Sequence, residues 1–92
     1  MKESTIEAAV VRHCKANNLL CYKFTSPARR GVPDRMIIGN GKVLFLELKA
    51  PGEKPTKLQE YEHSLLKSAH MWVSWVDNAP EAIDLIDSLF PL

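Results

Sequence analysis

A chain of 92 residues has room for one domain, so we expect residues 1–92 to form a single unit. Hydrophobic residues make up 46% and charged residues 25%, a balance that excludes a disordered or low-complexity protein. No apolar run approaches the roughly 20 residues that a membrane span needs, and the polar N-terminus has no signal-peptide pattern. We therefore expect a cytoplasmic protein with no membrane partner.

Charge is unevenly distributed along the chain although the net charge is only +1. Residues 12–57 hold ten basic and three acidic residues, a local charge of +7, whereas residues 58–92 carry −5. Such a positive segment is typical of a surface that binds a polyanion such as nucleic acid. Charge asymmetry is also common in small domains, so the charge alone leaves both interpretations open.

Hydrophobic periodicity and turn signals predict an alternating series of helices and strands. The order is helix, three strands, helix, strand and helix, over residues 4–16, 19–24, 36–38, 43–48, 57–69, 71–76 and from 78 onward. Asn40 and Gly41 predict a tight hairpin turn, because both residues tolerate positive φ angles. The pattern therefore predicts an α/β fold with a mixed sheet flanked by helices, in which a crossover joins the third and fourth strands.

Both of the first two helices begin with a spacing typical of a capping box. Glu7 stands three residues after Ser4, and Gln59 stands three residues after Thr56. Capping is the simpler interpretation of both positions, although Glu7 also lies where its side chain could reach the sheet. In the second helix, a stripe of apolar residues predicts the buried face: Leu58, Tyr61, Leu65 and Ala69. His63 and His70 are interpreted as surface residues.

The candidate catalytic residues lie on the predicted hairpin. Asp34 follows a rigid Gly-Val-Pro corner, and thirteen residues later come Glu47, Leu48 and Lys49. Side chains alternate on a strand, so Glu47 and Lys49 should lie side by side while Leu48 enters the core. Pairing the strands around the Asn-Gly turn places Asp34 near Glu47.

Two neighbouring carboxylates repel each other unless a proton or a cation lies between them. Mg²⁺ prefers oxygen ligands and retains waters, one of which could attack a phosphorus atom. Lys49 would then either help to deprotonate that water or stabilise charge on the phosphate. The alternative is a surface hairpin with an Asp34–Lys49 ion pair worth at most about 1 kcal/mol. The apolar run 43–46 argues against this alternative, because a strand that is apolar on both faces is normally buried.

The loop between the first two strands offers a basic surface near these residues. Ser26, Arg29 and Arg30 could hold backbone phosphates through charge and main-chain N–H groups, although a solvated loop is equally compatible with the sequence. Lys23 and Lys54, from the same basic segment, complete the predicted DNA-binding residues.

The motif Gly31-Val32-Pro33-Asp34, followed by Glu47-Leu48-Lys49 and then Gln59, resembles the PD-(D/E)xK nuclease superfamily, and more narrowly its stand-alone VRR-NUC (virus-type replication-repair) domains. The resemblance covers nearly the whole chain and implies a restriction-endonuclease-like αβββαβ core with a C-terminal helix. It implies one or two Mg²⁺ or Mn²⁺ ions in the active site, bound by Asp34, Glu47 and the main-chain carbonyl of Leu48. Lys49 would be the catalytic lysine and Gln59 a further active-site residue. Glu7 would be the helix-one acid of the metal site, with Glu3 one turn away as the alternative.

The same resemblance implies a metal-dependent DNA endonuclease, in a bacterium or encoded by a phage. Relatives of this size resemble Holliday junction resolvases, which implies a homodimer that cleaves branched DNA during replication, repair or recombination. Three alternatives remain: a catalytically silent module that binds branched DNA, a sequence-specific restriction-type nuclease, and a purely structural partner domain. The restriction-type alternative is disfavoured because so short a chain has little surface for reading base edges.

Overall fold

The computed structural model describes residues 2–91 and contains the helices and strands in the predicted order. The elements are α1 (Glu3–Ala16), β1 (Leu20–Lys23), β2 (Arg35–Gly39), β3 (Lys42–Leu48), α2 (Lys57–Ser68), β4 (Trp72–Val76) and α3 (Ala79–Leu89). The αβββαβ core and the C-terminal helix are therefore confirmed. Within residues 2–91, no helix has the length and apolar character that crossing a lipid bilayer requires.

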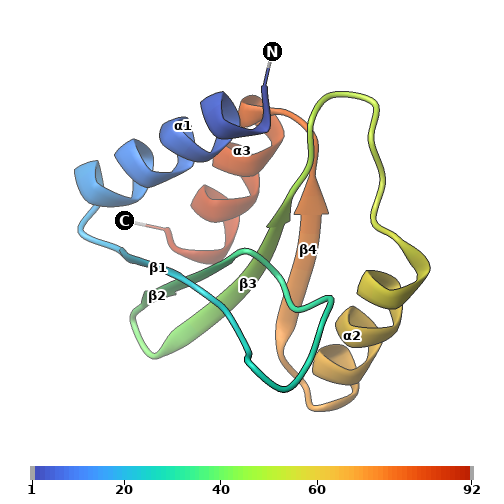
Figure 1. Cartoon of the computed structure of the whole chain (residues 1–92). Helices are drawn as coiled ribbons and strands as arrows, with labels where there is room; N and C mark the ends of the chain where they lie inside the picture. Colours follow the sequence, from blue (N-terminus) through green and yellow to red (C-terminus); the bar gives the residue numbers. More distant parts are fainter. Residues whose placement is uncertain (1, 92) are drawn as a thin grey trace.

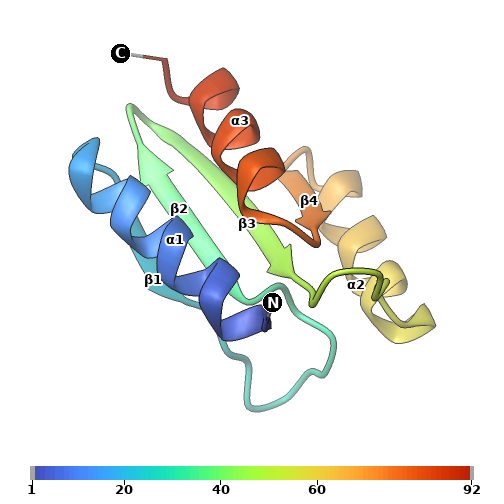
Figure 2. The same ribbon diagram turned by 90° about the horizontal axis from the view of Figure 1, so that it is seen from above.

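The four strands form one mixed sheet in the order β1-β2-β3-β4. The pairs β1–β2 and β2–β3 are antiparallel, whereas β3 and β4 run parallel and are joined through α2, as predicted. Helices α1 and α3 lie together over one face of this sheet, and α2 lies on the other side, alongside β4 (Figures 1 and 2). The molecule thus has two helices over one sheet face and a third helix near an edge of the other face.

The main core lies between the sheet and the α1–α3 layer. Alternate residues of β3 point into it, because successive side chains on a strand face opposite sides of the sheet. Its fully or almost fully buried residues are Ile6, Val10, Cys14, Ile37, Leu44, Leu46, Leu48, Val76, Ala82, Ile86 and Phe90. The β3 residues between them, Phe45 and Glu47, are also buried but face the side of the sheet on which α2 lies.

The β2–β3 hairpin has the tight turn that its sequence predicts. Asn40 and Gly41 have φ angles of 48° and 73°, as a two-residue hairpin turn with both central residues in the left-handed region requires. This turn fixes the register, in which Arg35 is paired with Leu46. Asp34, one residue before Arg35, is therefore brought opposite Glu47.

The predicted buried face of α2 is wrong. Leu58, Tyr61 and Leu65 are 47%, 57% and 39% exposed, and Ala69 lies in the exposed C-terminal cap. The buried residues of this helix are instead polar ones, Glu62 and His63, so the interpretation of His63 as a surface residue is also wrong. Polar partners on the loop and on the sheet decide which side of α2 faces inward, and hydrophobic periodicity does not register such partners.

The N-termini of two of the three helices are capped as the sequence predicts. Thr56 forms the predicted capping box with Gln59, and the Asn78 side chain accepts a hydrogen bond from the Glu81 N–H at the start of α3. The Ser4–Glu7 capping box is wrong. Helix α1 begins one residue earlier, at Glu3, and its N-cap residue makes no side-chain capping hydrogen bond. The Glu7 side chain is consequently available for a tertiary contact.

Candidate active site

The end of β3 places Glu47 and Lys49 side by side, as strand alternation predicts. Glu47 is 2% exposed, and its Oε2 atom lies 3.3 Å from Lys49 Nζ. Leu48, between them, points into the main core and is 1% exposed. The ion pair of this hairpin is therefore Glu47–Lys49 rather than the Asp34–Lys49 pair of the alternative interpretation.

Asp34 is held against β3 by main-chain hydrogen bonds. Its Oδ2 atom accepts a hydrogen bond of 2.9 Å from the Leu48 N–H, and its carbonyl accepts one of 2.8 Å from the Phe24 N–H. The corner before it depends on Gly31, whose φ of 84° is in the region that favours glycine. A Cβ atom at Gly31 would also lie 3.1 Å from the Leu58 carbonyl oxygen. The sequence thus fixes the Asp34 carboxylate beside the strand that carries Glu47.

Gln59 uses both ends of its amide, which confirms the capping box and also brings the side chain to Glu47. Its Oε1 atom accepts from the Thr56 N–H at 2.9 Å and completes the capping box. Its Nε2 group donates to Glu47 Oε2 at 3.2 Å. The cap of α2 therefore holds a hydrogen-bond donor against the buried carboxylate, and the structure brings Asp34, Glu47, Lys49 and Gln59 together.

The surroundings of Glu47 disfavour the negative charge of its carboxylate. Burial, followed by the negative charge of Asp34, raises the pKa of Glu47 to about 7, although Lys49 acts in the opposite direction. Glu47 Oε1 is buried and has no hydrogen-bond partner among residues 2–91. Leaving a buried carboxylate oxygen without a partner is costly. A cation that shared this oxygen with Asp34 would relieve both the repulsion and the unmet hydrogen-bonding capacity.

The residues present fit a hard divalent ion that retains water. In the described part of the chain, no three His, Cys, Asp or Glu side chains are grouped as a complete set of metal ligands. Asp34 and Glu47 would leave the other coordination positions to main-chain oxygen, water and substrate. Mg²⁺ is commonly held in this way, by one or two carboxylates together with waters and phosphate oxygens.

The two acids of α1 have different surroundings. Glu7 Oε2 lies 3.1 Å from Arg35 Nε, so its charge is already paired within the fold. Partial burial, followed by the negative charge of Asp34, raises the pKa of Glu3, while Lys49 opposes this rise. The metal-binding role expected for Glu7, with Glu3 as the alternative, remains a prediction.

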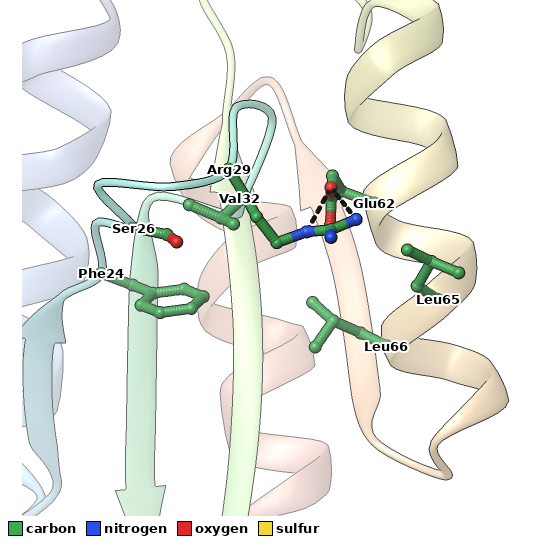
Figure 3. Close-up of a pocket in the computed structure, with 7 residues that line it drawn as sticks. All are labelled: Phe24, Ser26, Arg29, Val32, Glu62, Leu65 and Leu66. Carbon is green, nitrogen blue, oxygen red and sulfur yellow. Dashed lines mark hydrogen bonds and ion pairs between the residues drawn. The ribbon is translucent and has the colours of Figure 1, made fainter.

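The predicted DNA-binding residues lie in different surroundings. Lys23, Arg30 and Lys54 are exposed, at the end of β1 and in the two loops. Arg29 is exposed as well, but its guanidinium Nη2 lies 2.7 Å from Glu62 Oε1, and Ser26 is partly buried near Phe24 (Figure 3). Their role in binding DNA remains a prediction.

Arg29 and Glu62 close one side of a pocket of about 260 Å³ between the loop and α2. Its other walls are mostly apolar and include Phe24, Val32 and Leu66 (Figure 3). Glu62 was missed in the sequence because its partner is 33 residues away.

His63 was also missed, although a signal existed. It follows Gln59 by four residues, so the two share a helix face. Burial, followed by the charges of Lys67 and Lys49, lowers the pKa of His63, and its Nε2 atom is buried without a hydrogen-bond partner among residues 2–91.

Comparisons with known proteins agree with this geometry. No family model matches the chain. A protein named "Putative nuclease p44", from Acyrthosiphon pisum secondary endosymbiont phage 1, is 49% identical over 67 residues, which are 72% of this chain and 72% of that protein. A solved structure titled "VRR_NUC domain" superposes with a TM-score of 0.88 at 24% identity, and the match covers 98% of this chain and 99% of that one. The second likeness concerns the fold alone.

Proposed function

We propose that this chain, which belongs to the same nuclease family as the phage protein and has the fold of a VRR-NUC domain, is a DNA endonuclease that depends on Mg²⁺ or Mn²⁺. One observation carries the proposal: Asp34 and Glu47 lie beside Lys49, and Glu47 presents a buried oxygen without a partner among residues 2–91. Two neighbouring acids repel each other, whereas a divalent ion that promotes phosphodiester hydrolysis could be held between them.

Asp34 and Glu47 would hold one or two ions, with the Leu48 carbonyl as a main-chain ligand and Glu3 or Glu7 as the acid from α1. Bound there, the ion would lower the pKa of a water molecule and polarise a phosphate oxygen. The chain's contribution is to fix the carboxylates before the ion arrives. The Leu48 N–H holds Asp34, and the Gln59 amide holds Glu47.

Lys49 is the cation that the protein itself supplies. Its ammonium group lies 3.3 Å from Glu47 and its side chain is 13% exposed, so it is held at the site rather than extended into solvent. A fixed ammonium group is suited to donate hydrogen bonds to a phosphate whose negative charge grows in the transition state. Because the lysine is paired with a carboxylate, we favour this role over that of a base that removes a proton from water.

DNA is the substrate that the charge distribution supports. The segment that carries the site has a charge of +7, and the exposed residues Lys23, Arg30 and Lys54 would bind phosphates. The resemblance to small resolvases supports a homodimer acting on branched DNA, and the phage relative supports action in a bacterial cytoplasm. The alternative is a module that binds branched DNA without cutting it. The complete set of Asp34, Glu47 and Lys49 argues against that alternative.

The test is cleavage of labelled junction, flap and duplex DNA with Mg²⁺, with Mn²⁺ or with a chelator. We expect cutting with the ions and none with the chelator. Asp34→Asn should abolish cutting while binding persists, because the amide oxygen can still accept from the Leu48 N–H. Asp84→Asn, which changes an exposed acid on α3, is the matched control and should cut normally. Failure of the wild-type protein to cut any substrate with either ion would refute the enzymatic proposal.

A further inference from the structure

Trp75 of β4 lies immediately beside the candidate active site. In the parallel pairing of β3 and β4, Trp75 is the register partner of Glu47. Residues paired in this way present their side chains to the same face of the sheet, here the side on which α2 lies. Although it stands within the sheet, Trp75 is 37% exposed. An indole surface is therefore open to solvent one strand away from the buried carboxylate.

The open side of Trp75 lines two pockets along the edge of α2. They have volumes of about 160 and 190 Å³ and share Pro55, Glu60 and Trp75. Lys54 lines the first pocket and Lys67 the second. We call these two adjoining pockets the Trp75 groove. It has an aromatic surface, the carboxylate of Glu60 and a lysine in each half, and Ser64 adds a hydroxyl to the second pocket.

A second feature of the groove points to a ligand. His63 lines the second pocket, is 5% exposed, and has no hydrogen-bond partner for its Nε2 atom within residues 2–91. A buried polar atom without a partner costs about 1–3 kcal/mol, so such atoms are rare in folded proteins unless something binds nearby. An aromatic plane with polar atoms around it matches the chemistry of a nucleobase, which has a flat π-face and hydrogen-bonding edges.

We propose that the Trp75 groove binds the base of an unpaired nucleotide, stacked on Trp75 and flanked by phosphates that Lys54 and Lys67 contact. This inference rests on the proposed nuclease function and narrows its substrate. A base inside a duplex is stacked on its neighbours and cannot reach an indole ring, so the preferred DNA contains a single-stranded element such as a flap, a frayed end or an opened branch point. Because Trp75 is the register partner of Glu47, the unpaired nucleotide would lie one strand away from the reacting phosphate.

The other tryptophan supplies a matched control. Trp72 lies on the same strand, is 47% exposed, and is paired in register with the core residue Leu44 rather than with Glu47. Its ring is approached by the Lys42 ammonium group at 5.8 Å from the ring centroid. Each tryptophan can be studied separately, because the chain has two.

The first experiment measures fluorescence while a chelator prevents cleavage. In Trp72→Phe the emission comes from Trp75, and we expect a 16-nucleotide oligothymidylate to quench it. In Trp75→Phe the emission comes from Trp72, and the same oligonucleotide should leave it nearly unchanged. Equal quenching of both variants, or quenching of Trp72 alone, would overturn the proposal.

The second experiment measures affinity for a duplex with and without a four-nucleotide single-stranded extension, again with chelator present. Trp75→Ala should weaken binding of the extended duplex by about fivefold to 150-fold, the usual effect of losing one stacked base, and should leave the blunt duplex unaffected. Replacing the extension with abasic nucleotides should produce the same loss in the wild-type protein and no further loss in Trp75→Ala. The wild-type measurement of this arm requires no variant to fold.

An extension that gives no gain in affinity, or the same gain when abasic, would show that the groove binds no base. Binding is read without cleavage, so this result is distinct from failure of the nuclease proposal. Conversely, a protein that stacks a base on Trp75 but cuts nothing would refute the nuclease proposal while retaining the groove.

Discussion

Replacing Glu47 with glutamine should change how the stability of the metal-free protein depends on pH. In the folded protein the pKa of Glu47 is raised to about 7, by burial first and then by the charge of Asp34. In the unfolded chain the same group ionises near its ordinary value of 4.5. The folded state therefore binds a proton more tightly than the unfolded state, and the wild-type protein loses stability as the pH rises from 4.5 to 7.

The two pKa values set the size of this effect. Their separation corresponds to about 3 kcal/mol of unfolding free energy, which is fully lost above pH 7 and retained below pH 4.5. Glu47→Gln cannot ionise, so it lacks this loss. The attraction of Lys49 grows as Glu47 ionises and is already contained in the raised pKa, so the difference between the two proteins across pH reports the net effect of the carboxylate.

Urea unfolding of both proteins between pH 4.5 and 8.5, with chelator present, measures this difference. We expect the unfolding free energy of Glu47→Gln to rise relative to wild type by up to about 3 kcal/mol across the range. At pH 8, Mg²⁺ at a hundred times its dissociation constant should stabilise the wild-type protein by about 2.7 kcal/mol and the variant far less. A difference that does not vary with pH would refute the assignment of a strained buried carboxylate, and equal effects of Mg²⁺ would refute its role as a ligand.

Three further changes test other parts of the site. Gln59→Ala should lower the free energy of unfolding in urea by about 1–2 kcal/mol, because the α2 cap is lost, and should also reduce cleavage. Gln59→Glu should keep the cap and still lose cleavage. Gly31→Ala should lower the free energy of unfolding by about 1 kcal/mol or more. This loss should exceed that of Gly52→Ala, because both glycines have a positive φ but only a Cβ atom at Gly31 would meet a neighbour within 4 Å. Glu3→Gln should weaken Mn²⁺ binding in titration calorimetry more than Glu7→Gln does, and the reverse order would return the role to Glu7.

The central hairpin is the part of the site that the sequence predicts best. Its register follows from two local facts, the left-handed preference of Asn40-Gly41 and the alternation of side chains on a strand. Together these place Asp34 opposite Glu47 and send Leu48 into the core, as the hydrogen bond from the Leu48 N–H to Asp34 confirms. Both facts concern neighbours in the chain, so no tertiary information was needed.

The environment of α2 could not be predicted in the same way. A stripe of apolar residues was expected to face the sheet, but the inward face carries Glu62 and His63. Arg29, on a loop 33 residues earlier, pairs with Glu62, and a single sequence contains no sign of that contact. The burial of Glu62 depends on a partner that the fold brings to it, whereas hydrophobic periodicity assumes that the buried face is apolar.

Strand alternation also explains why two acids one turn apart on α1 have different surroundings. Arg35 lies on the sheet face that α1 covers, since Ile37, two residues later, belongs to the main core. Arg35 therefore meets Glu7, from the middle of the contact between α1 and the sheet. Asp34 is one residue away and points to the opposite face, where the α2 residue Gln59 reaches its partner Glu47. An acid from α1 can approach that face only around the end of the strands, and Glu3 lies in the first turn of the helix, where partial burial and then the charge of Asp34 raise its pKa.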